Sequence, residues 1–313
     1  MSVSVLSLEA QPVHQWRVHQ WQVHKLRGEE VLLRTWAEVS PGHYVLTARW
    51  PRGHDFYRPS QGTYDPMLLA ESVRQAVPLL SHAVHGVPRE FMQAWEHFRF
   101  TVEPLASLVT TADEEVRLVV AGSDVVRRGT RFAGMTMDIA VHLGERLIGT
   151  AHTRFNNQPA AIYRRLRGSY ADAGAALSRC LPPGPPVEAH RVDRHSAADV
   201  VLSPAPGGGN GRWELRVDPS HPVLFDHKVD HVPGMLLLEA ARQAAHAVGD
   251  GALAVTGMKT HFARYVEFDA PALVLAGEPV CDGTGGRRVE VTVEQHGVRA
   301  FTCEVTVEPA LGL

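Results

Sequence analysis

HPVLFDHKVDHVPGMLLLEAARQAAH, residues His221 to His246, is the sequence around which we expect the chain to fold. Pro233-Gly234 ends the structure that precedes it, and residues 235–247 are almost all apolar or small. This composition predicts a helix that is buried on most of its circumference. The rest of the chain must therefore supply the layers that cover this helix.

Three polar residues interrupt the apolar helix: Glu239, Arg242 and Gln243. At spacings of three and four they share one face, so a carboxylate, a guanidinium and an amide enter a largely apolar environment together. A buried charge is tolerated when it is paired, hydrogen-bonded or used in chemistry. The triplet is therefore either a structural ion pair of Glu239 with Arg242 or part of a functional site.

The same triplet occurs a second time in the chain. The motif E-x-x-R-Q-A is found at Glu71 to Ala76 and again at Glu239 to Ala244. Aligning the two motifs without gaps also pairs Met67 with Met235. Self-similarity of this kind indicates an internal repeat.

Each half of the chain reads as strands, one helix and then further strands. The strand-like segments are residues 31–39, 43–50, 116–120, 135–143 and 147–155 in the first half, and 273–280, 289–293 and 298–307 in the second. A long helix followed by antiparallel strands that must bury it predicts an α+β layered fold. Because Cys180-LPPGPP-Val187 reads as a stiff linker, we expect an N-terminal unit at 1–179, a linker at 180–187 and a C-terminal unit at 188–313.

Composition excludes several classes of protein. The 313 residues suffice for two domains, and 44% hydrophobic with 21% charged residues is ordinary for a soluble globular chain. The net charge of -3 argues against a nucleic acid or membrane surface as partner. Three cysteines without CxxC spacing predict neither disulfides nor a zinc site, and we expect no metal. No apolar run reaches the roughly 18 residues of a membrane span and residues 1–16 lack a signal-peptide pattern, so we expect a cytoplasmic protein.

Other catalytic motifs are missing from the sequence. It contains no G-x-S-x-G elbow, no HExxH and no Rossmann fingerprint. The glycine-rich segment Ser203 to Gly211 lacks the Lys-Ser/Thr of a phosphate loop, so we expect a hairpin or an irregular loop there.

Pro233-Gly234-Met235-LLL-Glu239-AARQA resembles the hot-dog fold enzymes that act on acyl thioesters, in which a long helix is wrapped by a curved antiparallel sheet. The longer pattern F-D-H-x-V-D-H-V-P-G-M-L-L-L-E-A-A-R-Q-A, with the weaker copy E-S-V-R-Q-A upstream, is similar to the A-factor biosynthesis family of gamma-butyrolactone and butenolide signal synthases. This resemblance covers nearly the whole chain. It implies a tandem (double) hot-dog fold, each repeat with one long central helix.

The resemblance also implies a function. It points to a cytoplasmic bacterial acyltransferase that joins a β-ketoacyl thioester, on acyl carrier protein or coenzyme A, to the hydroxyl of dihydroxyacetone phosphate. The product would be a β-ketoacyl ester of the phosphotriose, which then cyclises to a butenolide. We expect no cofactor beyond these substrates, no nucleic-acid or membrane partner, and either a monomer of two repeats or a homodimer.

The two repeats differ in the loop that precedes the helix. Asp226, His227, His231 and Gly234 of the second repeat stand opposite Arg58, Pro59, Thr63 and Pro66 of the first, so the acidic and histidine residues of this loop belong to the second repeat. Phe225 stands fourteen positions before Glu239, where hot-dog dehydratases have a histidine, so dehydration is not implied. We therefore expect one main catalytic centre in the second half. The first half would supply a pseudo-symmetric partner, part of the substrate tunnel or a second helix charge pair.

Acyl transfer to an alcohol needs a base, donors for the thioester oxygen and a place for phosphate. Glu239 is the first choice as base, because burial would raise its pKa. Arg242 would orient that carboxylate or bind phosphate. His231 or His227 is the alternative base, although each can equally be a loop histidine satisfied by a backbone carbonyl. The remaining residues expected to contact substrate are Gln243, Asp230, Gly234, Met235, Glu71 and Arg74, with backbone N–H groups at the helix start facing the thioester oxygen.

Two other functions remain compatible with this pattern. A hot-dog acyl thioesterase would release the acyl chain to water through the same Glu239. A non-catalytic module would only bind the acyl thioester or the signal. Turnover of a β-ketoacyl thioester with and without dihydroxyacetone phosphate separates these functions.

Overall fold

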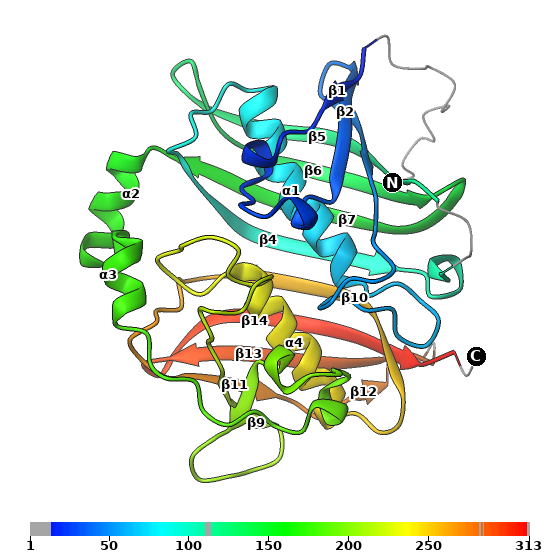
Figure 1. Cartoon of the computed structure of the whole chain (residues 1–313), viewed down its shortest axis with the longest axis vertical. Coiled ribbons are helices and arrows are strands. Elements are labelled where there is room, and N and C mark those ends of the chain that lie inside the picture. Colours follow the sequence, from blue (N-terminus) through cyan, green and yellow to red (C-terminus); the bar gives the residue numbers. More distant parts are fainter. Residues whose placement is uncertain (1–13, 110–113, 282, 284, 312–313) are drawn as a thin grey trace.

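The chain folds into two similar halves joined by a short helical segment (Figure 1). The structure, a computed structural model, describes residues 14–109, 114–281, 283 and 285–311. The first half contains β1 Trp16–Arg17, β2 Leu33–Ser40, β3 His43–Ala48, α1 Met67–Ala83, β4 Met92–Val102, β5 Val116–Arg128, β6 Arg131–Leu143 and β7 Arg146–Gln158. The joining segment contains α2 Ala160–Arg167 and α3 Ala173–Ser178. The second half contains β8 Leu202–Pro204, β9 Arg212–Leu215, α4 Gly234–Val248, β10 Leu253–Phe262, β11 Ala272–Ala276, β12 Val280–Cys281, β13 Arg287–Gln295 and β14 Val298–Pro309.

One antiparallel sheet runs through both halves. Over the described residues it has 14 strands in the order β1-β2-β3-β5-β6-β7-β4-β10-β14-β13-β11-β9-β8, with β12 paired to β13. The halves meet where β4 pairs with β10, and the register places His97 opposite His261. Both long helices lie in front of the strands in the view of Figure 1. The expected tandem hot-dog fold is confirmed.

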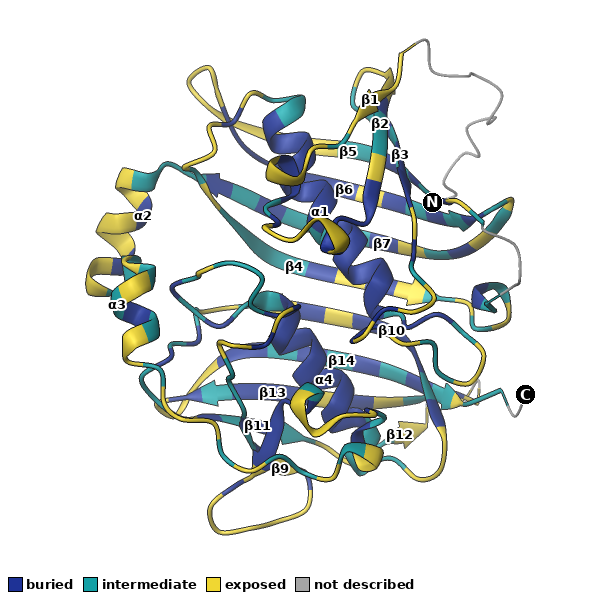
Figure 2. Ribbon diagram, in the orientation of Figure 1, coloured by how far each residue is buried: buried dark blue, intermediate teal, exposed yellow. Residues whose placement is uncertain are grey.

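Burial explains why the two long helices form where the sequence predicts them. In α4 every residue from Met235 to Ala245 is buried, and in α1 the same holds from Met67 to His82 except for Arg74 (Figure 2). The predicted helix at 235–247 matches α4 closely. Helices that are apolar all round are stable only inside a core, and the sheet supplies that core.

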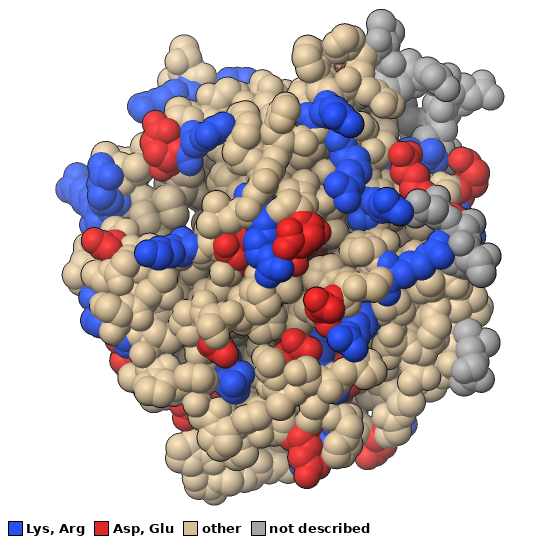
Figure 3. All heavy atoms as spheres, in the orientation of Figure 1, with Lys and Arg blue, Asp and Glu red and all other residues tan. Residues whose placement is uncertain are grey.

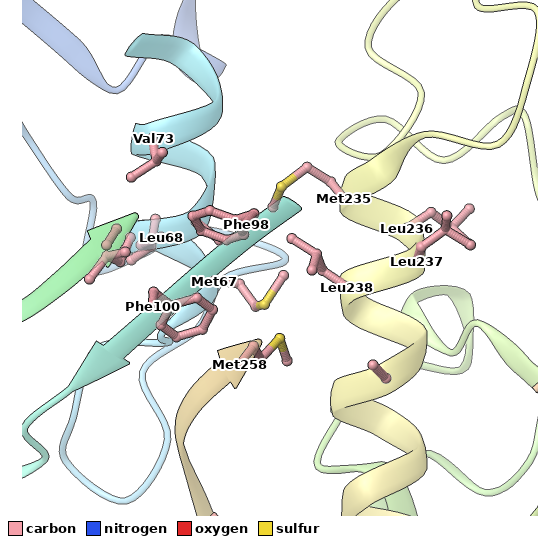
Figure 4. Close-up of a cluster of buried hydrophobic side chains, with 14 of the residues drawn as sticks. Met67, Leu68, Val73, Phe98, Phe100, Met235, Leu236, Leu237, Leu238 and Met258 are labelled. Atoms are coloured by element: carbon pink, nitrogen blue, oxygen red, sulfur yellow. The ribbon is translucent and has the colours of Figure 1, made fainter. Parts of the chain in front are cut away.

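The cores of the two halves are continuous. Figure 4 shows Met67 of α1, Phe98 and Phe100 of β4, Met258 of β10 and Leu238 of α4 gathered in one apolar cluster. All five side chains are at most 2% exposed. Neither half therefore has a complete core of its own at this junction.

The connection between the halves differs in one respect from the expected linker. Residues 181–187 form neither helix nor strand, as the proline-rich sequence predicts. The preceding α2 and α3, which the sequence analysis did not predict, pack at the edge of the junction (Figure 1). The limits of the two domains at 1–179 and 188–313 stay a prediction. In the described part of the chain, no helix is both long and apolar enough to cross a membrane.

Because β4 and β10 are each other's sheet neighbours, separating the halves exposes two strand edges and the apolar cluster between them. We predict that residues 1–180 and 187–313, expressed separately, aggregate or remain unfolded, whereas the full chain is soluble. Gel filtration and circular dichroism of each half measure this. Soluble, folded monomers of both halves would show that the junction is not needed for folding.

Candidate active site

A cavity of about 1670 Å³ lies at the junction of the two halves. Its walls come from residues 20–26, from α1, from the start of β4, from α2, and from the loop 223–233 that leads into α4. Ligand cavities are typically about 300–1,000 Å³, so this cavity has room for more than one small substrate. Basic and acidic side chains are mixed on the face shown in Figure 3, in line with the small net charge.

The α1 wall of the cavity is built on Glu71. Its carboxylate accepts hydrogen bonds from Arg74 at 2.8 and 2.9 Å and from Gln75 at 2.8 Å, and the Lys25 ammonium lies 3.1 Å away. Burial alone would raise the pKa of Glu71, but the charges of Arg74 and Lys25 outweigh it and lower that pKa to about 2. Glu71 is therefore an anion that holds two cations at the cavity wall.

Opposite α1, the loop before α4 presents a hydrogen-bonded chain. His231 Nδ1 lies 2.6 Å from the Asp230 carboxylate, which also accepts hydrogen bonds from the Tyr163 hydroxyl at 2.6 and 2.8 Å. Burial would raise the pKa of Asp230, but the His231 and Tyr163 hydrogen bonds and the charge of Arg167 lower it. Asp230 therefore stays a carboxylate, so His231 donates to it through Nδ1–H.

Helix α2 fixes this loop from the side. Arg167 forms an ion pair with Glu267, donates to the Asp230 carbonyl oxygen at 3.1 Å, and places its guanidinium 4.2 Å from the Tyr265 ring centre. The Tyr265 ring in turn contacts the His231 ring edge to face, with centroids 4.5 Å apart. The connector that the sequence analysis missed thus holds the Asp230–His231 pair in place.

The start of α4 also opens into the cavity. Gly234 and Met235 line it, directly after Pro233. The first N–H groups of any helix have no acceptor within that helix, and the helix dipole makes this end positive. The predicted donor group at this helix start is therefore placed at the cavity wall.

The loop of the second repeat crosses over to the helix of the first. The Asp226 carboxylate accepts from the backbone N–H groups of Leu26 and Arg27 at 2.6 and 3.1 Å, which ties the loop to the α1 side of the cavity. Burial, and then the charge of Arg74, lower the pKa of His227 to about 4, so its imidazole is neutral at pH 7. The predicted loop residues are brought together with Glu71 and Arg74.

Glu239 sits in a second cluster, which is closed. Its fully buried carboxylate accepts from Arg194 at 2.6 and 2.8 Å, from Arg242 at 3.0 and 3.2 Å, and from Gln243 at 2.6 Å. The predicted burial is confirmed, but the predicted rise in pKa is wrong. Burial does act to raise it, yet the charges of Arg194 and Arg242 dominate and lower the pKa of Glu239 to about 2.

Arg242 has its donors occupied within this cluster. Besides Glu239, its guanidinium donates to the Asp193 carboxylate at 3.0 Å and to the carbonyl oxygens of Val192 and Asp193 at 3.1 Å. Arg242 lines a separate space of about 40 Å³, enough for about one water molecule. A substrate-binding role for Arg242 or for the fully buried Gln243 stays a prediction, and this packing gives it no support.

Arg194 and Lys25, the partners of the two helix carboxylates, were not predicted from the sequence. A signal was present, because each is the third residue of a Val-x-basic word, Val23-His24-Lys25 and Val192-Asp193-Arg194. In both repeats the valine carbonyl accepts from the helix arginine at 3.1 Å. Extending the repeat alignment to this word would have identified both cations.

The fold and the cavity define a double hot-dog protein, and solved structures with the same fold support this class. An acyl-ACP thioesterase from Bacteroides thetaiotaomicron superposes with a TM-score of 0.50 at 13% identity, covering 84% of this chain and 98% of that one. A protein assigned as an oleoyl thioesterase from Lactobacillus plantarum gives a TM-score of 0.51 at 8% identity, covering 86% and 97%. At these identities the likeness shows the fold alone.

Sequence comparison identifies the family. The model of the A-factor biosynthesis hotdog domain matches residues 8–157 and 176–309, so the chain belongs to that family. A protein of Streptomyces virginiae named 2-oxo-3-(phosphooxy)propyl 3-oxoalkanoate synthase is 40% identical over 88% of this chain and 92% of its own length. Proteins of the same name from Streptomyces griseus and Streptomyces coelicolor are 37% and 39% identical over 93% and 88% of this chain, and over 94% and 87% of their own lengths.

We predict that Glu239→Gln destabilises the fold, because it leaves two buried guanidinium groups without their shared anion. The expected loss is about 3–5 kcal/mol in the free energy of unfolding at pH 7, measured by denaturant titration. Since the folded pKa lies below the ordinary value of 4.5, the wild-type stability from this group is present above pH 4.5 and is lost as pH falls toward 2. Glu239→Gln should lack that part of the acid dependence.

Glu304→Gln is the matched control, because it breaks only the exposed ion pair with Arg288 and should cost at most about 1 kcal/mol. Turnover measured on the folded fraction separates structure from catalysis. If Glu239→Gln is as stable as wild type but loses turnover 10²-fold to 10⁴-fold, Glu239 is the base that the sequence analysis predicted.

Proposed function

We propose that this protein is a 2-oxo-3-(phosphooxy)propyl 3-oxoalkanoate synthase. The observation that carries the proposal is the shared name of relatives that are 37–40% identical over most of the chain. That name describes an ester between a 3-oxo acid and the free hydroxyl of dihydroxyacetone phosphate. The enzyme accordingly transfers a β-ketoacyl group from a thioester to that hydroxyl.

The reaction sets simple chemical demands. The C–S bond of the thioester breaks, a C–O bond forms, and the hydroxyl proton passes to the departing thiolate, so no electrons are gained or lost. The site must take the proton, stabilise the oxyanion of the tetrahedral intermediate and exclude water. We propose that no metal or other cofactor takes part, because protein groups at the cavity can meet each demand.

His231 is the base that the geometry favours. Asp230 fixes the Nδ1–H tautomer at 2.6 Å, Tyr163 and Arg167 hold Asp230 in turn, and the His231 side chain remains 25% exposed at the cavity. An imidazole held in this way can take the hydroxyl proton at Nε2 and return it to the thiolate. The catalytic role of Glu239 stays a prediction, but its carboxylate is enclosed by Arg194 and Arg242 and its lowered pKa makes it a weak base.

The start of α4 is placed to stabilise the oxyanion. The N–H groups at Gly234 and Met235 belong to the positive end of a helix and lie in the same cavity as His231. Apolar side chains in that cavity, among them Val77, Leu237 and Phe262, offer a surface for the acyl chain.

The carrier of the acyl group is acyl carrier protein or coenzyme A. Both present the acyl group at the end of a long arm, which suits a cavity that opens at the junction of the halves. The acyl thioester and dihydroxyacetone phosphate both occur in the cytoplasm, where we propose that the reaction takes place. We propose that one chain, with its two repeats, contains a whole site, because both repeats contribute walls to this cavity.

We predict that the purified protein forms a phosphorylated ester from a β-ketoacyl thioester only when dihydroxyacetone phosphate is present. Mass spectrometry of the products with and without the triose measures this. Free acid at equal rates in both samples would instead identify a thioesterase, and binding without any product would identify a non-catalytic module.

We predict that His231→Asn lowers kcat by about 10²-fold to 10⁴-fold, because it removes the base while keeping a polar side chain of similar reach. Asp230→Asn should also lower kcat with little change in KM, since the buried Asp230 positions His231. His261→Asn, an exposed histidine on β10, is the control and should turn over normally. Wild-type kcat in His231→Asn, with an unchanged melting temperature, would rule out His231 as the base.

A further inference from the structure

The two carboxylate clusters are built on one pattern, so their differences are informative. In each, the helix glutamine binds the backbone of the segment before it: Gln75 accepts from Leu32 N–H at 3.0 Å and Gln243 from Val201 N–H at 2.9 Å. In each cluster, a valine carbonyl oxygen accepts a hydrogen bond from the helix arginine. The residue after that valine has a left-handed backbone conformation, with φ 52° at His24 and at Asp193. We call the Glu71 cluster, which faces the cavity, the open cluster and the Glu239 cluster the closed cluster. Position 24 of the open cluster thus corresponds to position 193 of the closed cluster.

In the closed cluster each cation has two carboxylates. Arg242 is bound by Glu239 and, through Nη1, by Asp193 at 3.0 Å. Arg194 is bound by Glu239 and, through Nη1, by Asp65 at 3.1 Å. Two guanidinium groups and three carboxylates therefore leave no positive charge uncompensated.

The open cluster has one carboxylate for two cations. His24 stands where Asp193 stands in the closed cluster, and within residues 14–109, 114–281, 283 and 285–311 the ion pairs of both Arg74 and Lys25 are with Glu71 alone. Asp226 is nearby, but its carboxylate accepts from the backbone N–H groups of Leu26 and Arg27. Among the described residues, the cations of the open cluster therefore lack the second carboxylate that forms an ion pair with each of their counterparts.

The uncompensated groups face the cavity. The Arg74 side chain is 22% exposed, whereas that of Arg242 is 3% exposed, and both Arg74 and Lys25 line the cavity. The neighbouring imidazoles carry no charge of their own at pH 7. Burial first, and then nearby positive groups including Arg74, lower the pKa of His24 to about 3 and that of His227 to about 4. Arg74 and Lys25 are therefore the charged donors that this wall of the cavity presents to an anion.

We infer that Arg74 and Lys25 form an anion subsite that binds the phosphate of a phosphomonoester. Arg74 binds Glu71 through Nε and Nη2, so Nη1 lies outside that pair, and with the adjacent Lys25 ammonium it supplies charge and donors of the kind that a phosphate takes. The inference rests on the proposed function, in which dihydroxyacetone phosphate is the acceptor. The acceptor's phosphate, rather than that of the acyl carrier, is the occupant, because Lys25 is only 7% exposed and the carrier's phosphate remains outside, at the far end of its arm.

The sharpest test introduces into the open cluster the second carboxylate that the closed cluster has. His24→Asp places a carboxylate where Asp193 stands, and His24→Asn removes the same imidazole without adding charge. Both residues tolerate the left-handed conformation at position 24. The comparison of the two variants therefore isolates one negative charge beside Arg74.

We expect His24→Asp to bind inorganic phosphate at least about tenfold more weakly than His24→Asn in isothermal titration calorimetry, because the new carboxylate repels the anion. The KM for dihydroxyacetone phosphate should rise by a similar factor, while the KM for the acyl thioester stays the same. Arg288→Gln, which removes a charge outside the cavity, controls for net charge and should bind phosphate like wild type.

Equal phosphate affinity in the two variants would overturn the inference, and so would a change confined to the KM of the acyl thioester. If His24→Asp does not fold, Arg74→Lys replaces it: this change keeps the charge but removes the fork, and phosphate affinity equal to wild type would equally refute the subsite. A failure of the proposed function looks different. In that case wild type forms no phosphorylated ester, whatever its affinity for phosphate.

Discussion

Two buried carboxylates, Glu71 and Glu239, determine how the segments around the long helices pack. A carboxylate that is fully removed from water is stable only with a compensating cation and satisfied oxygens. Each helix supplies one arginine and one glutamine, and a segment far away in the sequence supplies the second cation, Lys25 or Arg194. The 3₁₀ turns before these cations, Gln20–Val23 and Ala189–Val192, are thereby fixed against α1 and α4.

The same scaffold yields one closed cluster and one open cavity because the loops before the helices are exchanged between the halves. The loop of the first repeat carries Asp65 to Arg194, which completes the ion pairs around Glu239. The loop of the second repeat carries Asp226 and His227 to the α1 side of the cavity and Asp230 and His231 to the opposite wall, where they line the cavity instead of filling it. The ionisable loop and the helix carboxylate of one repeat therefore belong to two different sites.

The E-x-x-R-Q-A repeat and the apolar run at 235–247 suffice to predict two buried helices, because the hydrophobic pattern of a helix indicates which of its faces are buried. The pKa of Glu239 could not be predicted in this way. Its direction depends on the number of cations that reach the carboxylate, and Arg194 lies 45 positions earlier in the chain. Desolvation acts to raise that pKa, and the charges of Arg194 and Arg242 together lower it. The crossing of the loops, likewise, is a property of the topology and not of any local pattern.

The repeated and the unrepeated residues therefore carry different information. A triplet that both repeats contain meets a need that both repeats share, which here is the compensation of charge inside a core, and so its presence does not identify a site. Chemistry requires groups that are not already satisfied by the fold. In this chain such groups occur at positions where the two repeats differ. His231 of the second repeat corresponds to Thr63 of the first, and Lys25 and His24 of the first correspond to Arg194 and Asp193 of the second. The asymmetry between the halves, rather than the motif they share, is what leaves Arg74 and Lys25 facing the cavity and supports the proposed anion subsite.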